Sequence, residues 1–130
     1  MTDVLNASLP LAEMLAVYLL FRLKHFMADY LLQTTWMARG KQKDEGWATA
    51  LFAHAGMHAI GTTAIAAAFA PSMMFLGGID LFLHALIDRA KVASCRQLNP
   101  SQPVFWWLHG IDQEAHNLTH FAFVLAIMLA

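Results

Sequence analysis

The stretch DLFLHALID, Asp80 to Asp88, places three polar side chains at four-residue intervals in an otherwise apolar run. On an α-helix, positions four and eight residues apart lie on one face. Asp80, His84 and Asp88 therefore predict a polar stripe along an apolar helix. Carboxylates and imidazoles are also common ligands of divalent metal ions. This stretch thus indicates both the element that organises the fold and its chemistry.

The same four-residue spacing recurs in three other segments of the chain. The residues concerned are His25 and Asp29, then His54 and His58, then Asp112, His116 and His120. We predict four helices, over about residues 10–39, 47–70, 72–97 and 103–130. Connections rich in glycine, proline or charge separate them. The pattern predicts an all-α four-helix bundle with a polar His and Asp interior, in one domain over residues 1–130.

The composition favours a membrane protein. The chain is 58% hydrophobic and 13% charged, and its mean hydropathy is +0.49; roughly 25% charged residues is usual for a soluble domain. Each predicted helix reaches the ~20 residues that span a bilayer, and inward-facing ionisable groups would avoid contact with lipid. Residues 1–8 are predicted to be a short polar lead. Its start, Met1–Val4, lacks the positive region of a secretory signal, so we expect the whole chain to be retained. The net charge of −1 gives no indication of a nucleic-acid partner.

Basic residues predict the orientation in the membrane. They gather at two connections, as Arg39, Lys41 and Lys43 and as Arg89, Lys91 and Arg96. The positive-inside rule then places both connections in the cytoplasm and both termini outside. Interfacial tryptophans would lie at the same ends, namely Trp36, Trp47, Trp106 and Trp107.

The second predicted helix is crowded with small residues, including Ala55 and Ala59. Small residues allow membrane helices to approach closely. We therefore expect a homodimer that forms through the lipid-facing side of this helix, and leucine at Ala55 or Ala59 should weaken it.

Counting inward from the basic ends divides the polar residues into two layers. One layer contains Asp29, His54, Asp88 and Asp112, and the other contains His25, His58, His84 and His116. The rise of an α-helix puts these layers ~6 Å apart. Imidazoles mixed with carboxylates predict two divalent metal ions; we favour zinc, with iron, manganese and nickel left open. Haem held by two histidines would leave the carboxylate layer without a purpose.

Asp80 and His120 lie about one turn deeper than the two layers. Asp80 either contributes to a third site or forms a buried ion pair with Arg22, which counts to the same depth. His120 either binds a metal or supports a ligand through a hydrogen bond.

Towards the cytoplasm, Gln33, Lys91 and His109 share one depth and would form a mouth that recognises an anionic group. The alternative is that Lys91 only extends to the interface. The run Lys41–Glu45 is expected to be a solvated loop.

Four motifs carry a family resemblance. They are HFMADYLLQ from His25, HAGMHA from His54, HALID from His84 and DQEAH from Asp112. These motifs resemble those of a family of small bacterial and phage integral membrane proteins of unknown function. The resemblance implies a multi-pass protein of the bacterial cytoplasmic membrane, with a link to phage. More distantly, the inward His and Asp residues are similar to those of membrane-bound metal-dependent hydrolases.

Our leading functional hypothesis is a metal-dependent membrane hydrolase acting on a phosphoester-like substrate. Two ions would activate a water and polarise the substrate. Asp88 or Asp112 would act as the catalytic carboxylate, as a general base where metal does not fully occupy it. The alternative is a non-enzymatic metal protein, either a sensor, a scaffold or a transporter. Apolar outer segments such as Leu11–Leu20 count against transport, and a fully closed site would favour a structural role.

Overall fold

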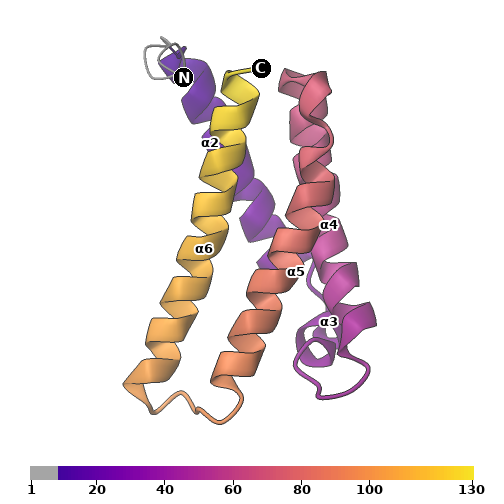
Figure 1. Cartoon of the computed structure of the whole chain (residues 1–130), viewed down its shortest axis with the longest axis vertical. Coiled ribbons are helices and arrows are strands. Elements are labelled where there is room, and N and C mark those ends of the chain that lie inside the picture. Colours follow the sequence, from indigo (N-terminus) through magenta and orange to yellow (C-terminus); the bar gives the residue numbers. More distant parts are fainter. Residues whose placement is uncertain (1–8) are drawn as a thin grey trace.

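The computed structural model describes residues 9–130, which form helices joined by short connections (Figure 1). The long helices are α2 (Leu11–Phe26), α4 (Trp47–Phe69), α5 (Leu76–Cys95) and α6 (Pro103–Met128). No strand occurs within residues 9–130, so the all-α prediction is confirmed. The expected polar lead, residues 1–8, lies outside the described residues.

The first predicted helix is interrupted. Helix α2 ends at Phe26 and passes into a π-helical turn, Met27–Leu31. A separate short helix, α3 (Thr35–Gly40), then begins after Thr34, whose hydroxyl accepts a hydrogen bond from the Met37 N–H at 3.3 Å. Threonine favours this capping position because its oxygen satisfies a free N–H of the first turn. The prediction of one continuous helix over residues 10–39 is therefore wrong in its second half.

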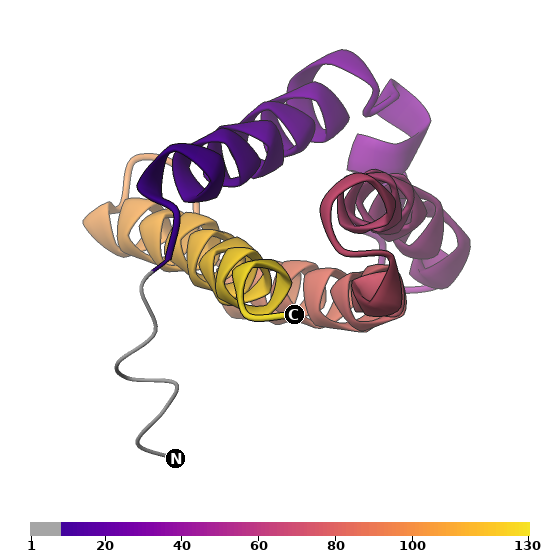
Figure 2. The ribbon, with the colours of Figure 1, turned by 90° about the horizontal axis from the view of Figure 1, so that it is seen from above.

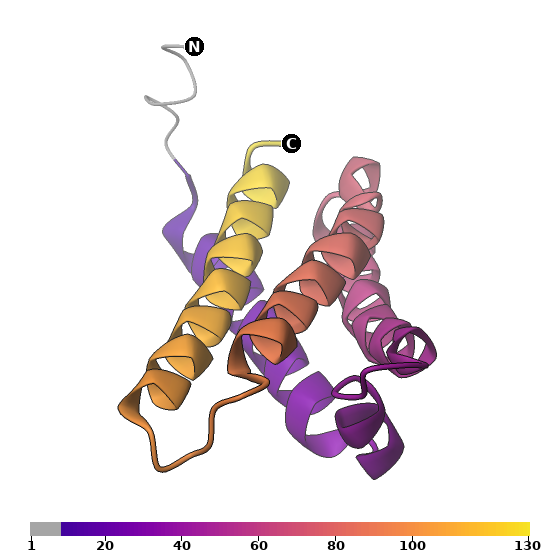
Figure 3. The same ribbon diagram turned by 60° about the horizontal axis from the view of Figure 1, so that its bottom comes forward.

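The four long helices alternate in direction and surround a shared interior. Seen from above, α2 lies along one side, with α6 and α5 opposite and α4 completing the ring (Figure 2). Helices α4 and α5 make the most extensive contact. Gly77 permits it, because a side chain there would clash with Thr63 and with the carbonyl of Ala59. Helix α3 and the two long connections lie together at one end of the molecule (Figure 3).

Apolar side chains fill the opposite end of the bundle. The cluster consists of Val17, Phe21, Ile65, Ala66, Ala70, Leu76, Phe123, Val124 and Ile127. They come from the middle of α2, from the beginning of α5 and from the ends of α4 and α6, which lie at this side of the molecule (Figure 1). The polar stripes therefore lie between this apolar cluster and the connections at the other end of the bundle.

Away from the apolar cluster, polar residues lie inside the bundle and many large apolar residues lie on its outer surface. The buried polar side chains are His25, His54, His58, Thr62, Asp80, His84, Asp88, Asp112, His116 and His120. Exposed positions include Ile60, Phe82 and Trp107, each with about two thirds or more of its surface accessible. Soluble proteins rarely bury so many ionisable groups.

By length and hydropathy, one helical stretch of the described residues, Pro71–Cys95, could cross a membrane. The prediction of four such helices is not confirmed. Helix α2 has only 16 residues, because the π-helical turn ends it early. In α4 and α6, the inward-facing His and Asp side chains lower the hydropathy.

The small residues of α4 do not all face outward. Ala55 is fully buried and packs with Leu51 and Ala85, so the expectation that it lies on an outer face is wrong. One side of α4 packs against the rest of the bundle, and Ala55 lies on that side. Ala59 is half-buried and lines a shallow groove between α4 and α5.

Candidate metal centre

Imidazole rings from all four long helices meet in the middle of the bundle. The rings of His58 and His84 stack with centroids 3.7 Å apart, and the His84 and His116 centroids are 4.2 Å apart. The Nε2 atoms of His54 and His84 are separated by 3.3 Å. Because α4, α5 and α6 run alongside one another, their four-residue stripes bring these rings to one level.

Among residues 9–130, three sets of His and Asp residues place their ligand atoms within 4.8 Å of one another. The inner group consists of Asp29, His54, His58 and His84. The mouth group consists of His84, Asp88 and His116. The upper group consists of His25, His58 and His120. Seven of the eight predicted ligands thus lie in such groups, and His120 joins them.

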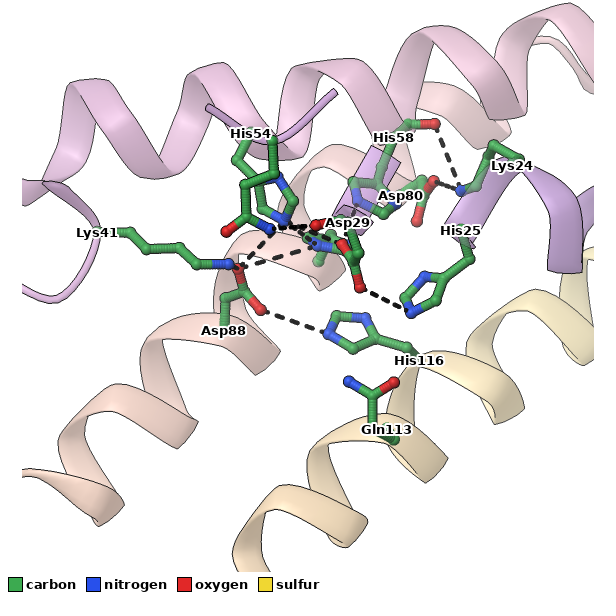
Figure 4. A network of polar contacts seen from close by, with 12 residues as sticks. Lys24, His25, Asp29, Lys41, His54, His58, Asp80, Asp88, Gln113 and His116 are labelled. Atoms are coloured by element: carbon green, nitrogen blue, oxygen red, sulfur yellow. Dashed lines mark hydrogen bonds and ion pairs between the residues drawn. The ribbon is translucent and has the colours of Figure 1, made fainter. Parts of the chain in front are cut away.

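Asp29 connects the predicted layers. Its Oδ1 lies 3.1 Å from His58 Nε2 and 3.3 Å from His54 Nε2, and its Oδ2 lies 3.1 Å from His25 Nε2 (Figure 4). Asp29 stands in the π-helical turn, a form that often occurs at functional sites. The turn moves this carboxylate out of the register of a regular helix. The rings of the predicted histidine layer do lie next to one another, namely those of His25, His58, His84 and His116. The two layers are not separate ligand sets, however, because the inner group and the mouth group each draw on both.

Asp112 lies beside the mouth group but does not belong to it. Its Oδ2 accepts hydrogen bonds from Lys91 Nζ at 2.9 Å and from Gln113 Nε2 at 3.1 Å. Its Oδ1 is buried without a hydrogen-bond partner and lies 3.6 Å from His116 Nε2. One carboxylate oxygen is therefore held by hydrogen bonds, and the other faces the His116 imidazole without one.

Asp80 belongs to a different network. It accepts hydrogen bonds from Lys24 Nζ at 2.8 Å and from the Thr62 hydroxyl at 2.6 Å, and it is in none of the three groups. The alternative ion pair of Asp80 with Arg22 is wrong, because Arg22 hydrogen-bonds to the side chain of Asn117 instead. The predicted depths assume one continuous helix over residues 10–39. The helical segment ends at residue 31, so the depth predicted for Arg22 relative to Asp80 on α5 is wrong.

A pocket of about 710 Å³ opens at the basic end of the bundle. Its lining includes four cationic or imidazole side chains and one member of the mouth group: Lys41, Lys91, Arg96, His109 and Asp88. Lys91 and His109 were predicted to share a mouth, and the pocket brings them together. Gln33 is not part of the lining; its amide donates to the Asp29 carbonyl oxygen at 3.2 Å.

Sequence reasoning missed the role of Lys41. Its Nζ lies 2.7 Å from Asp88 Oδ2, and its side chain is 15% exposed, so it is not a solvated loop residue as expected. The available signal was its place in the connection at the same end as Asp88. Helical periodicity stops at Gly40, so the direction in which Lys41 points could not be predicted from it.

The donor set fits a divalent ion. The buried Nδ1 atoms of His25, His54, His58, His84 and His120 have no hydrogen-bond partner. The Nε2 atoms of His25, His54 and His58 converge on the Asp29 carboxylate, and His84 Nε2 lies 3.3 Å from His54 Nε2. His120 Nε2 instead lies 3.1 Å from Lys24 Nζ. Adjacent Nε2 atoms cannot all satisfy one another, because a neutral imidazole carries one proton. A cation placed among them would use several as ligands. These groups could therefore hold a metal ion.

Comparison with known proteins identifies a family. The family model described as a protein of unknown function, DUF3307, matches residues 16–130. The chain therefore belongs to the DUF3307 family, which agrees with the expected membership of a family of unknown function. No curated protein and no solved structure matches the chain.

Proposed function

We propose that this DUF3307 protein is a metal-dependent hydrolase of the membrane, with two divalent ions in the bundle, and that it acts on a phosphoester-like substrate. One observation carries this proposal. The mouth group borders the basic pocket through Asp88, so an ion held there would have access to substrate. Catalytic metal sites keep such an open position, whereas structural sites are closed.

The three groups overlap, so they do not hold three independent ions. A histidine Nε2 binds one ion at a time, and His84 is shared by the inner and mouth groups. Assigning His84 to the mouth group leaves two sets of three ligands: Asp29, His54 and His58, then His84, Asp88 and His116. Each set has the three protein ligands that are usual for catalytic zinc, and zinc is the ion we favour.

The residues around the mouth group have complementary roles. Bound divalent ions would supply Lewis acidity and lower the pKa of a bound water. The unpartnered Oδ1 of Asp112 lies close to His116 and can accept a proton from an attacking water. Lys91 holds the other oxygen of Asp112 and so keeps the carboxylate in place. Asp112 is thus our candidate general base, and Asp88 is a ligand.

The distribution of side chains supports a bilayer environment. Ionisable groups facing lipid are costly, so a membrane bundle turns them inward, as the buried His and Asp residues are turned here. Trp36, Trp106 and Trp107 are exposed at the same end as the basic pocket, where an interfacial belt would lie. We propose a multi-pass protein of the bacterial cytoplasmic membrane with the pocket in the cytoplasm and both termini outside.

A second candidate function is a non-enzymatic metal sensor or scaffold. It is favoured by the ion pairs of Lys41 with Asp88 and of Lys91 with Asp112, which already compensate two carboxylates. A transporter would require a polar path through the whole bundle. The apolar cluster that includes Phe21 and Val124 fills the end opposite the pocket. The described residues at this end therefore offer no polar path.

Two aspartate variants test the proposed hydrolase against the alternative. Protein purified in detergent is loaded with Zn²⁺ and assayed on phosphomonoester, phosphodiester and lipid phosphate substrates. Asp112→Asn should abolish turnover while two ions remain bound, and Asp88→Asn should lose turnover together with one ion. Glu114→Gln is the matched control, because Glu114 is exposed on the same helix. Absence of turnover in the parent on all three substrate classes, with two ions bound, would favour the sensor or scaffold.

A further inference from the structure

The basic pocket contains cations that are paired with the carboxylates of the candidate centre. Lys41 Nζ lies 2.7 Å from Asp88 Oδ2, and Lys91 Nζ lies 2.9 Å from Asp112 Oδ2. Arg96 pairs at 2.8 Å with Asp44, which is largely exposed, so it lies nearer the rim. The cations thus extend from the rim of the pocket to the metal ligands. We propose that the pocket binds the phosphate group of a phosphomonoester, and that this anion draws Lys41 and Lys91 away from Asp88 and Asp112.

The competing charges at Asp88 explain why such an exchange is expected. Its Oδ1 lies 3.5 Å from His116 Nε2, and its Oδ2 lies 2.7 Å from Lys41 Nζ. An ion at the mouth group would share this carboxylate with the Lys41 ammonium at close range. Two cations on one largely buried carboxylate repel each other, and burial reduces the screening by water. Anything that binds Lys41 from the pocket side therefore favours the ion.

Phosphate chemistry suits the vacated positions. A phosphomonoester carries close to two negative charges and three acceptor oxygens, so it can accept from two ammonium groups at once. Lys41 comes from the connection before α4 and Lys91 from α5, so the two approach the pocket from different elements. Lysine binds phosphate as a flexible point charge, which lets Nζ move from a carboxylate to the anion without backbone rearrangement.

The rest of the lining indicates what the phosphate is attached to. Val92, Leu98, Phe105 and Trp106 add an apolar and aromatic wall to the charged one. A substrate with an apolar part next to its phosphate would use both walls. This description fits a phosphorylated lipid headgroup and also a soluble aryl or alkyl phosphate, and the experiment below separates these sources.

This proposal rests on the proposed metal centre and adds that anion binding in the pocket and metal binding at the centre strengthen each other. If the anion strengthens metal binding, the metal strengthens anion binding by the same factor. Couplings between sites of this kind are roughly 5–150-fold in affinity. We expect the metal dissociation constant to fall by at least about fivefold when the pocket is occupied.

The test measures metal affinity rather than turnover. The full-length protein is titrated with Co²⁺, whose visible absorption reports ligation, in nanodiscs with and without phenyl phosphate, and in nanodiscs with and without phosphatidic acid. Phenol is the neutral control for phenyl phosphate. The same titrations are repeated on Lys41→Met and Lys91→Met. Lys43→Met is the matched control, because Lys43 lies in the same connection, is exposed, and does not line the pocket.

We expect at least one phosphomonoester to tighten Co²⁺ binding in the parent and in Lys43→Met. In the absence of any anion, Lys41→Met should bind Co²⁺ more tightly than the parent does. Adding the anion should no longer change the Co²⁺ affinity of this variant. A response to phosphatidic acid alone would identify the source as lipid, and a response to phenyl phosphate alone would identify it as soluble.

Equal Co²⁺ affinity with and without either anion would overturn the link while leaving the metal centre and the hydrolase proposal standing. A Lys41→Met variant that responds to anion like Lys43→Met would also overturn it. Failure of Co²⁺ to bind the parent would overturn both proposals. Anion-linked binding without any turnover would retain the link and remove only the hydrolase.

Discussion

Lys24 and Asp80 form a buried ion pair beside the imidazole cluster, with Lys24 Nζ 2.8 Å from Asp80 Oδ2. The exposed fractions of the two side chains are 8% and 1%. The ammonium also lies 3.0 Å from the Thr62 hydroxyl and 3.1 Å from Nε2 of His120, a member of the upper group. The Lys24 ammonium therefore already places a positive charge next to the upper group. For this reason we expect the protein to bind two metal ions rather than three.

Replacing Lys24 should destabilise the protein strongly. Lys24→Met leaves Asp80 buried without its cation, and breaking a buried pair from one side typically costs about 3–5 kcal/mol. The loss should appear as a lower midpoint of thermal unfolding in detergent. The double variant Lys24→Met with Asp80→Asn should recover part of it, because the uncompensated charge is gone. A Lys24→Met midpoint equal to that of the exposed-lysine control Lys43→Met would contradict this role.

Metal removal should lower stability. An ion that binds only the folded state adds about 2.7 kcal/mol when its concentration is a hundred times its dissociation constant. Elemental analysis should find two divalent ions per chain, and a strong chelator should lower the unfolding midpoint. His58→Ala should reduce the metal content, whereas His109→Ala should not, because His109 lines the pocket but belongs to no ligand group. Unchanged metal content in His58→Ala would argue against the inner group.

The proposed orientation can be tested through the single cysteine. Cys95 is half-buried and lines the basic pocket. A membrane-impermeant maleimide should therefore label it in inside-out vesicles and leave it unlabelled in intact cells. Ser72→Cys in a Cys95→Ser background gives the converse control, because Ser72 is exposed at the other end of α5, next to the apolar cluster. Labelling of Cys95 in intact cells would refute the orientation.

Self-association through α4 remains a prediction, and the structure narrows the residues that test it. Ala64 and Ala67 are exposed and line the shallow groove between α4 and α5. Leucine at either position would hold a neighbouring helix away, so it should weaken a dimer. Ala48→Leu is the matched control, since Ala48 is exposed on α4 outside the groove. Native mass spectrometry that finds the same oligomer in Ala67→Leu and Ala48→Leu would exclude this interface.

The residues at the centre were predictable because of local spacing. His54 with His58, His84 with Asp88, and Asp112 with His116 each lie one helical turn apart, so each pair must share a face of its own helix. Such ionisable stripes on apolar helices face inward in any fold that spares them contact with lipid. The all-α class and the candidate ligands therefore follow from the sequence alone.

Which side chains of different helices contact one another depended on the tertiary structure. The π-helical turn that carries Asp29, the break before Thr34 and the path of the following connection determine how α2 and Lys41 meet the other helices. None of these is a periodic feature. Arg22 and Lys24 lie about 200° apart around α2, so the orientation of this helix decides which of the two cations faces Asp80. Sequence periodicity thus determined which residues face the interior. Only the packing of the helices decided which cation neutralises which carboxylate, because that choice depends on the relative rotation and depth of separate helices.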